Sequence, residues 1–181
     1  VVLARQIDVR PNGANALFEA DVRTGTAELE AAWLRNKLAF EPRDGGQVAR
    51  AIAGRIEATE AALAQRSSAA SKSMLKHLRA ARAAFVEVVD FVAGSTKASP
   101  NAVFAGSVPY LMLAGNVVAG WQMARALIVA EDQRAEDAAF MDAKVATARF
   151  YAEHILSKVP GVRDSIIEGH AAVNDMALEA F

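Results

Sequence analysis

Cysteine is absent from the 181 residues of this chain. Its absence excludes disulfide bonds, zinc sites built on thiolates and a cysteine nucleophile. A chain without disulfides suits a reducing compartment, and Arg5, Asp8 and Arg10 interrupt the apolar run that a secretory signal needs. We therefore expect a cytoplasmic location.

Histidine is scarce, and its spacing does not suit metal binding. The three histidines are His77, His154 and His170, and none belongs to a Glu-x-x-His pair that would place two ligands on one helix face. Glu168 and His170 are two residues apart, so they would diverge on a helix. The sequence also lacks a glycine-rich loop of the phosphate-binding or dinucleotide-binding type. We predict no catalytic, cofactor-binding or metal-binding residue in this chain.

An excess of charge of one sign is also missing. The 20 basic residues nearly balance the 21 acidic ones, which disfavours nucleic acid as a partner. Hydrophobic residues make up 53% of the chain, and its length allows one domain with a substantial core.

Apolar residues recur at helical spacing along most of the chain, whereas the alternation of a half-buried strand is almost absent. We predict an all-α fold, with an antiparallel four-helix bundle and extra short terminal helices as its architecture. The serine-rich residues 67–73 are predicted to form a polar hinge or loosened turn. The predicted helices cover about 27–40, 46–66, a third ending near 93, the apolar segment that follows 100, 137–156, and one short helix in the tail.

The apolar segment contains no charged residue from Ala102 to Ala124, and about 20 such residues could cross a bilayer. Ser107, Asn116 and Gln122 within it would lack hydrogen-bond partners in lipid. We therefore expect no membrane span and interpret the segment as the innermost helix of the bundle. Pro109 would either bend this helix or mark a second helix start.

Six residues of this region and of the next helix are candidates for packing or interface roles. Gly115 and Gly120 are predicted to lie against a neighbouring helix, since they carry no side chain. Arg125 is predicted to pair with a carboxylate such as Glu131 or Glu153, or alternatively to contact another domain or subunit. The aromatic candidates are expected to be core or interface residues; they are Tyr110, Trp121 and Tyr151.

Four stretches of this sequence resemble the C-terminal domain of a bacterial branch of the acyl-CoA dehydrogenases that includes enzymes acting on 3-methylmercaptopropionyl-CoA. The resemblance covers about residues 43–181, and its most specific part is the ordered series from Pro109 to Arg125 followed by Phe150, Tyr151 and Phe181. The stretches are RDGGQVARAI (43–52), PYLMLAGNVVAGWQMARAL (109–127), RFYAEHIL (149–156) and SIIEGHAAVNDMALEAF (165–181).

The resemblance implies a flavoprotein of fatty acid metabolism whose FAD-binding body lies upstream. In that family a glutamate in a Glu-Gly-Thr sequence is the base. The nearest match here is Thr24-Gly25-Thr26, and threonine at position 24 cannot act as a carboxylate base. We therefore assign residues 1–42 to a weakly matched edge of the dehydrogenase body and residues 43–181 to a C-terminal helical domain, with no catalytic residue in either.

Two functions are compatible with the sequence. The first is a non-catalytic C-terminal domain that docks on the catalytic domains, stabilises them or forms a homo-oligomer. The second is a free-standing helical bundle that binds a small apolar ligand or a partner protein.

Overall fold

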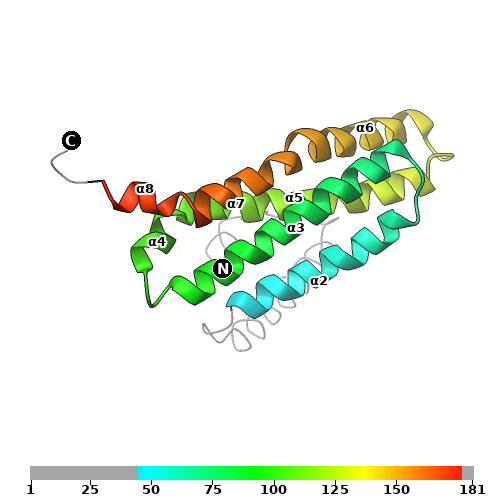
Figure 1. Ribbon diagram of the computed structural model, residues 1–181. Helices are drawn as coiled ribbons and strands as arrows, with labels where there is room; N and C mark the ends of the chain where they lie inside the picture. The colour runs from blue at the N-terminus through cyan, green and yellow to red at the C-terminus, as the bar shows by residue number, and fades with distance from the viewer. Residues whose placement is uncertain (1–44, 177–181) are drawn as a thin grey trace, which may run out of the picture. The chain divides into compact units, whose positions relative to one another are not determined.

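The computed structural model describes residues 45–176, and every regular element within that range is a helix (Figure 1). The predicted helix at 27–40, Thr24 and the terminal residue Phe181 lie outside this range. The elements are α2 (Gly45–Ala64), α3 (Ala69–Ser95), α4 (Pro100–Ala105), α5 (Ser107–Asp132), α6 (Ala138–His154), the 3-10 turn η1 (Leu156–Lys158), α7 (Val159–Ile167) and α8 (His170–Asn174). The all-α class is confirmed for the part of the chain that the structure describes.

The predicted hinge or turn at residues 67–73 is confirmed only in part: residues 65–68 separate α2 from α3, but α3 already begins at Ala69. The Ser68 hydroxyl caps the new helix by accepting a hydrogen bond from the backbone N–H of Ser71, 2.9 Å away. The Ser71 hydroxyl donates to the carboxylate of Glu131 on α5 at 2.9 Å. Ser68 therefore caps the start of α3, and Ser71 links α3 to α5 through Glu131.

The apolar segment forms two helices, α4 and α5, with Gly106 between them. Pro109 falls in the first turn of α5, where its missing N–H would have had no partner within the helix. Of the two alternatives for Pro109, the second helix start is therefore the observed one.

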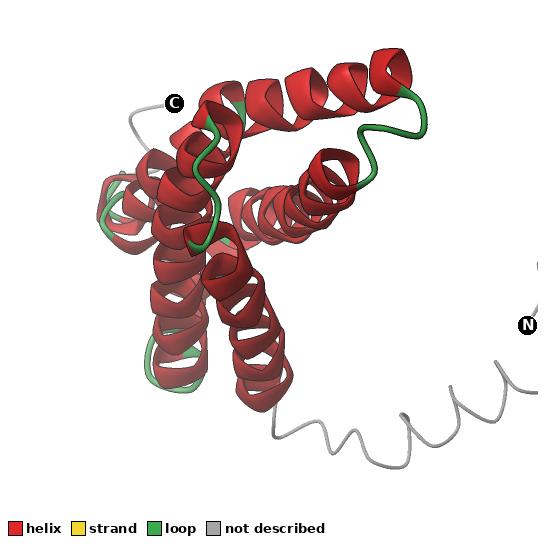
Figure 2. Cartoon of the chain, turned by 90° about the vertical axis from the view of Figure 1, so that its right-hand side faces the viewer, coloured by secondary structure: helices red, strands yellow, loops and turns green. Residues whose placement is uncertain are grey.

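Helix α3 lies at the centre of the packing, since it contacts α2, α5, α6, α7, η1 and α4. Figures 1 and 2 show α2 along one side of α3 and the α6–η1–α7 segment along another. The expectation that the apolar segment is the innermost helix is wrong, because α5 leaves one apolar face exposed, on which Leu111 is 72% exposed. The structure establishes the helical class of residues 45–176. The antiparallel four-helix bundle stays a prediction.

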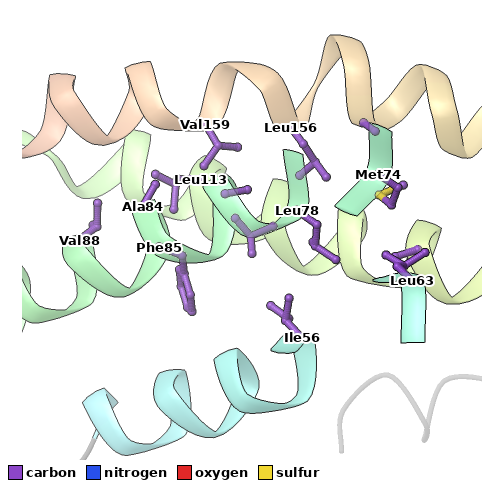
Figure 3. Close-up of a cluster of buried hydrophobic side chains, with 14 of the residues drawn as sticks. Ile56, Leu63, Met74, Leu78, Ala84, Phe85, Val88, Leu113, Leu156 and Val159 are labelled. Carbon is purple, nitrogen blue, oxygen red and sulfur yellow. The ribbon is translucent and has the colours of Figure 1, made fainter. Parts of the chain in front are cut away.

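The core is built from one stripe of each long helix, as the helical periodicity predicted (Figure 3). The α3 stripe contributes Leu78, Phe85 and Val88, which are at most 4% exposed. Side chains from α2, α5, η1 and α7 meet it, and burial of large aliphatic groups stabilises the fold by about 1.5–3 kcal/mol each. These side chains include Ile56, Leu63, Leu113, Val117, Leu156 and Val159.

Candidate interaction surface

Helix α5 has one buried face and one exposed face, although both are apolar. The buried face packs on the core through Leu113, Val117, Gly120, Ala124, Leu127 and Ala130. The other face begins with Val108, Leu111 and Met112, which are 70%, 72% and 60% exposed. Side chains of this size and type are normally buried, so their grouping on one helix marks a candidate contact surface.

We define the α5 outer face as Val108, Leu111, Met112, Gly115, Ala119, Gln122, Ala126 and Val129. Successive members are one, three or four residues apart, so they share one side of the helix. No charged residue belongs to this set. Phe104 of the preceding helix α4 is also 67% exposed.

Among residues 45–176, α5 is the one helix whose length and composition would allow it to cross a membrane, and 28% of its most apolar window is buried. One such helix is weak evidence, because core helices of water-soluble proteins have the same length and composition.

Gly120 and Gly115 occupy opposite environments. A Cβ atom added at Gly120 would lie 2.6–2.9 Å from three side-chain atoms of Leu156, so this glycine lets η1 approach α5 closely. A Cβ atom added at Gly115 would have no heavy atom within 4 Å outside its own helix turn. The prediction that Gly115 lies against a neighbouring helix is therefore wrong for the part of the chain that the structure describes, because Gly115 belongs to the α5 outer face.

The three aromatic candidates join α5 to its neighbours within the fold. The indole N–H of Trp121 donates a hydrogen bond to the Thr59 hydroxyl of α2 at 2.8 Å. The Tyr151 hydroxyl of α6 donates to the Asn116 carbonyl at 3.2 Å. Tyr110 is half-buried against the core cluster. Burial raises the pKa of Tyr110 and of Tyr151 above the ordinary value, so both phenols stay neutral and suit packing.

Arg125 does not form the predicted ion pair with Glu131 or Glu153. Glu131 accepts hydrogen bonds from Arg66 and from Ser71. Glu153 is held by a second set of hydrogen bonds, from side chains of α3 and α6.

In that second network, Glu153 accepts from Arg149 and from Ser73. Arg125 is exposed, donates to the Gln122 side chain at 3.0 Å and lies 5.7 Å from the Trp121 ring centroid. The ion-pair prediction fails because other donors occupy both carboxylates.

A broad groove is lined by residues of α5, of α6 and of the loop that joins them. Its volume is about 490 Å³, and Arg125 and Lys144 are the two charged residues among those that line it. Apolar side chains, including Val129, Phe140 and Met141, form much of the remaining lining. The Lys144 ammonium lies 4.9 Å from the centroid of the Phe140 ring. We call this feature the α5–α6 groove.

The described residues offer no arrangement that suggests catalysis. Within residues 45–176, no three His, Asp or Glu side chains gather in a way that could hold a metal ion. The most deeply buried carboxylate, Glu60, is held by Arg82 in a salt bridge between α2 and α3. The exposed apolar and cationic surface of α5 and α6 is therefore the candidate functional feature, and it suits contact with another molecule or domain.

Sequence reasoning missed most of this surface. The helical spacing of apolar residues at 137–156 would place Phe140 on a buried stripe, yet it is 52% exposed. The sequence did not reveal that Leu111 is exposed, because α5 is apolar on all sides and its periodicity does not show which side the core covers. Nor did it reveal that Lys144 of α6 lines the groove, since that depends on how α6 packs beside α5. The one feature of the sequence that pointed to this surface was the charge-free stretch from Ala102 to Ala124 followed by Arg125.

Comparison with known proteins shows what this chain is similar to. Residues 52–177 match the family described as "Acetyl-CoA dehydrogenase C-terminal like". The chain is also 37% identical, over 152 residues, to 3-methylmercaptopropionyl-CoA dehydrogenase of Ruegeria pomeroyi. The alignment covers 79% of this chain and 25% of the relative, so the chain spans about a quarter of that protein's length.

Proposed function

Because this chain belongs to the family of acyl-CoA dehydrogenase C-terminal domains, we propose that it serves a larger FAD-dependent dehydrogenase as a non-catalytic docking domain. Its role is to bind the catalytic domains of that enzyme and hold them in their working arrangement. Three quarters of the relative's length lies outside the alignment, which leaves room for a catalytic portion of ordinary size.

The α5 outer face is the observation that carries this proposal. Leu111 and Met112 expose most of their apolar surface to water in the described part of the chain. Covering such a patch with another domain would contribute favourable free energy of roughly 25 cal/mol per Å² of buried apolar area. Exposed apolar patches on proteins commonly mark such contact sites.

The chemistry of the whole enzyme belongs to the catalytic portion. In an acyl-CoA dehydrogenase, a glutamate removes a proton from Cα while FAD accepts a hydride from Cβ. This chain would contribute by positioning and stability, and its absence of cysteine suits the cytoplasm.

The alternative of a free-standing bundle that takes a small apolar ligand is less well supported. The α5–α6 groove is open to solvent, whereas small-molecule sites commonly enclose about 70–90% of their ligand. The family membership also favours a domain of a larger enzyme.

Two measurements test the docking proposal. Mass spectrometry of the native gene product should give a mass well above the 19.2 kDa of this chain. The separately produced catalytic portion should then bind the 181-residue chain in isothermal titration calorimetry. A native product of this size alone, or a catalytic portion that shows no binding, would contradict the proposal.

A further inference from the structure

We propose that the α5–α6 groove is a specific acceptor for an amphipathic, carboxylate-bearing helix of the catalytic portion. This inference rests on the docking function proposed above and specifies the chemistry of the partner. It is carried by the charges that line the groove, by the groove's shape and by its position on α5.

The charges of the groove lack internal compensation. Arg125 and Lys144 form no salt bridge with any carboxylate among residues 46–176, and none of the nine lining residues is acidic. Both cations lie over aromatic rings instead, Arg125 at 5.7 Å and Lys144 at 4.9 Å from the ring centroids. This arrangement leaves N–H groups of both side chains able to donate to an incoming acceptor. A partner that carries carboxylates would complement this positive potential.

Two of the acids that lie close to the groove along the chain already have cationic partners. Asp132 bonds to Arg66, and Asp142 pairs with Arg134 at 2.8 Å. Arg125 and Lys144 are therefore not paired with these two acids, and they are the charged side chains that line the groove.

The shape of the groove favours a helix over a small anion. It is lined by residues of two helices and is open to solvent on its outer side, so it would cover one face of an occupant. Helix-in-groove recognition has this geometry, with apolar anchors of the incoming helix against an apolar floor. Ala126, Val129 and Met141 provide such a floor, and Phe140 provides an exposed ring that a partner side chain could cover.

The groove also continues the α5 outer face. Gln122, Ala126 and Val129 line the groove and follow Leu111 and Gly115 on the same side of the helix. A partner that covers the apolar N-terminal half of this face would thus reach Arg125 and Lys144 at its C-terminal half. The apolar half contributes affinity, whereas the cationic half selects an acidic partner and fixes its register.

The test measures binding of the 181-residue chain to the separately produced catalytic portion by isothermal titration calorimetry. The probe variant is Arg125→Gln with Lys144→Gln, which keeps polar side chains of similar reach but removes both charges. The matched control is Arg55→Gln with Lys72→Gln, which removes two exposed cations from α2 and α3. We expect the probe variant to bind about tenfold or more weakly and the control within about twofold of the parent, in keeping with measured losses of interfacial charge pairs.

A second readout separates charge recognition from misfolding. The probe variant should unfold at the parent's urea midpoint, since both side chains are exposed. Raising the ionic strength from about 0.05 M to about 0.5 M should weaken binding of the parent far more than binding of the probe variant, because salt screens the charges that the variant lacks.

Each outcome decides between the two proposals. Binding of the probe variant with the parent's affinity and salt dependence overturns the groove as an acceptor and leaves docking through the α5 outer face in place. Absence of any binding by the parent overturns both proposals. Binding of the parent to vesicles of phosphatidylglycerol, with none to the catalytic portion, also overturns both, because the partner would then be a lipid surface.

Discussion

At the scale of single residues, the fold depends on a few contacts between helices that tolerate little change. Glu60 is 3% exposed and receives two hydrogen bonds from Arg82, at 2.8 and 3.1 Å. Gly120 leaves the space into which Leu156 packs. Both positions join helices that are separate in sequence, so substitutions there report on tertiary packing rather than on local helix propensity.

Gly120→Ala and Gly115→Ala should change stability in opposite directions. The methyl group at position 120 collides with the buried Leu156 side chain, and overpacking costs typically about 1–3 kcal/mol. The methyl group at position 115 enters open space, so the gain in helix propensity of about 0.5–1 kcal/mol remains. Urea unfolding of both variants beside the parent measures the difference, and a Gly120→Ala midpoint above that of Gly115→Ala would show that the packing at Leu156 is wrong.

Gly120→Leu should lower stability further than Gly120→Ala, whereas Gln122→Ala should leave it nearly unchanged because Gln122 is exposed.

Arg82→Leu should destabilise the chain by about 2–3 kcal/mol, because it leaves the Glu60 carboxylate buried with a more distant partner. That partner is Arg79, whose Nε lies 3.7 Å from the carboxylate. The double variant Glu60→Leu with Arg82→Leu should recover most of this loss, since buried ion pairs are often replaceable by apolar side chains. Chemical denaturation of the two single variants and the double variant completes the cycle. Additive losses in the double variant would refute the coupling.

His77 should make the chain less stable as the pH falls from about 7.5 to about 5.5. Burial lowers the pKa of His77 below its ordinary 6.5, and Lys76 lowers it further while Glu153 opposes the shift. The unfolded chain therefore takes up a proton at a higher pH than the folded chain does, and stability is lost as the pH falls below the unfolded pKa. His77→Gln should flatten this part of the pH profile of the urea midpoint. An equally steep profile in the variant would mean that His77 does not contribute.

At the scale of helices, α5 combines two roles that usually belong to different elements. Its buried face holds Leu113 and Val117 in the core, and its outer face exposes Leu111 and Met112. A helix that is apolar on all sides is expected to be covered on all sides. The structure covers one side of α5 with helices of this chain, and we propose that the catalytic portion covers the other.

Substitutions on the two faces of α5 should therefore separate stability from docking. Leu111→Ser with Met112→Ser should change the unfolding free energy of the isolated chain by about 0.5 kcal/mol or less per site, because neither side chain is packed. Leu113→Ala should cost about 2–4 kcal/mol, because it empties space in the core. Thermal unfolding and titration with the catalytic portion give the two readouts. A large loss of stability in the Leu111 and Met112 variant would place these side chains in the fold and contradict an interaction surface.

At the scale of the whole molecule, the chain is a helical module whose described residues hold no metal cluster and whose family ties it to a much larger enzyme. Its relative is four times as long as the shared region. We propose a division of labour in which a catalytic portion binds FAD and acyl-CoA and this C-terminal module contributes contacts.

The purified 181-residue chain should bind no flavin and should not oxidise acyl-CoA, since we assign the base glutamate and the FAD site to the catalytic portion. Absorbance between about 350 and 500 nm, where an oxidised flavin cofactor absorbs, and a dye-reduction assay with an acyl-CoA check this expectation. Titration of the chain with free FAD provides the control for loss of cofactor during purification. A yellow preparation with one FAD per chain would contradict the assignment.

Sequence patterns predicted much of the secondary structure, because helix formation depends on neighbours within one or two turns. The helix expected at 46–66 appears as Gly45–Ala64, and the one expected at 137–156 appears as Ala138–His154 followed by a 3-10 turn. Motifs such as PYLMLAGNVVAGWQMARAL likewise identified the family, which the comparisons confirm.

The candidate surface was less predictable, since it depends on which neighbour each side chain meets. Nothing local distinguishes Gly115 from Gly120, yet one lies under Leu156 and the other in open space. Nothing local shows that Arg66, rather than Arg125, reaches Glu131. These outcomes depend on the approach of helices that are distant in sequence.

The sequence by itself thus determined the helices, their amphipathic stripes and the family, because periodicity and motifs are properties of contiguous residues. The tertiary structure alone decided that α3 is the central helix and that α5 leaves one apolar face uncovered. The physical reason is that a uniformly apolar helix gains similar free energy from burying either face. The side that it buries is set by the helices that pack around it, and the side that remains is the surface available to a partner.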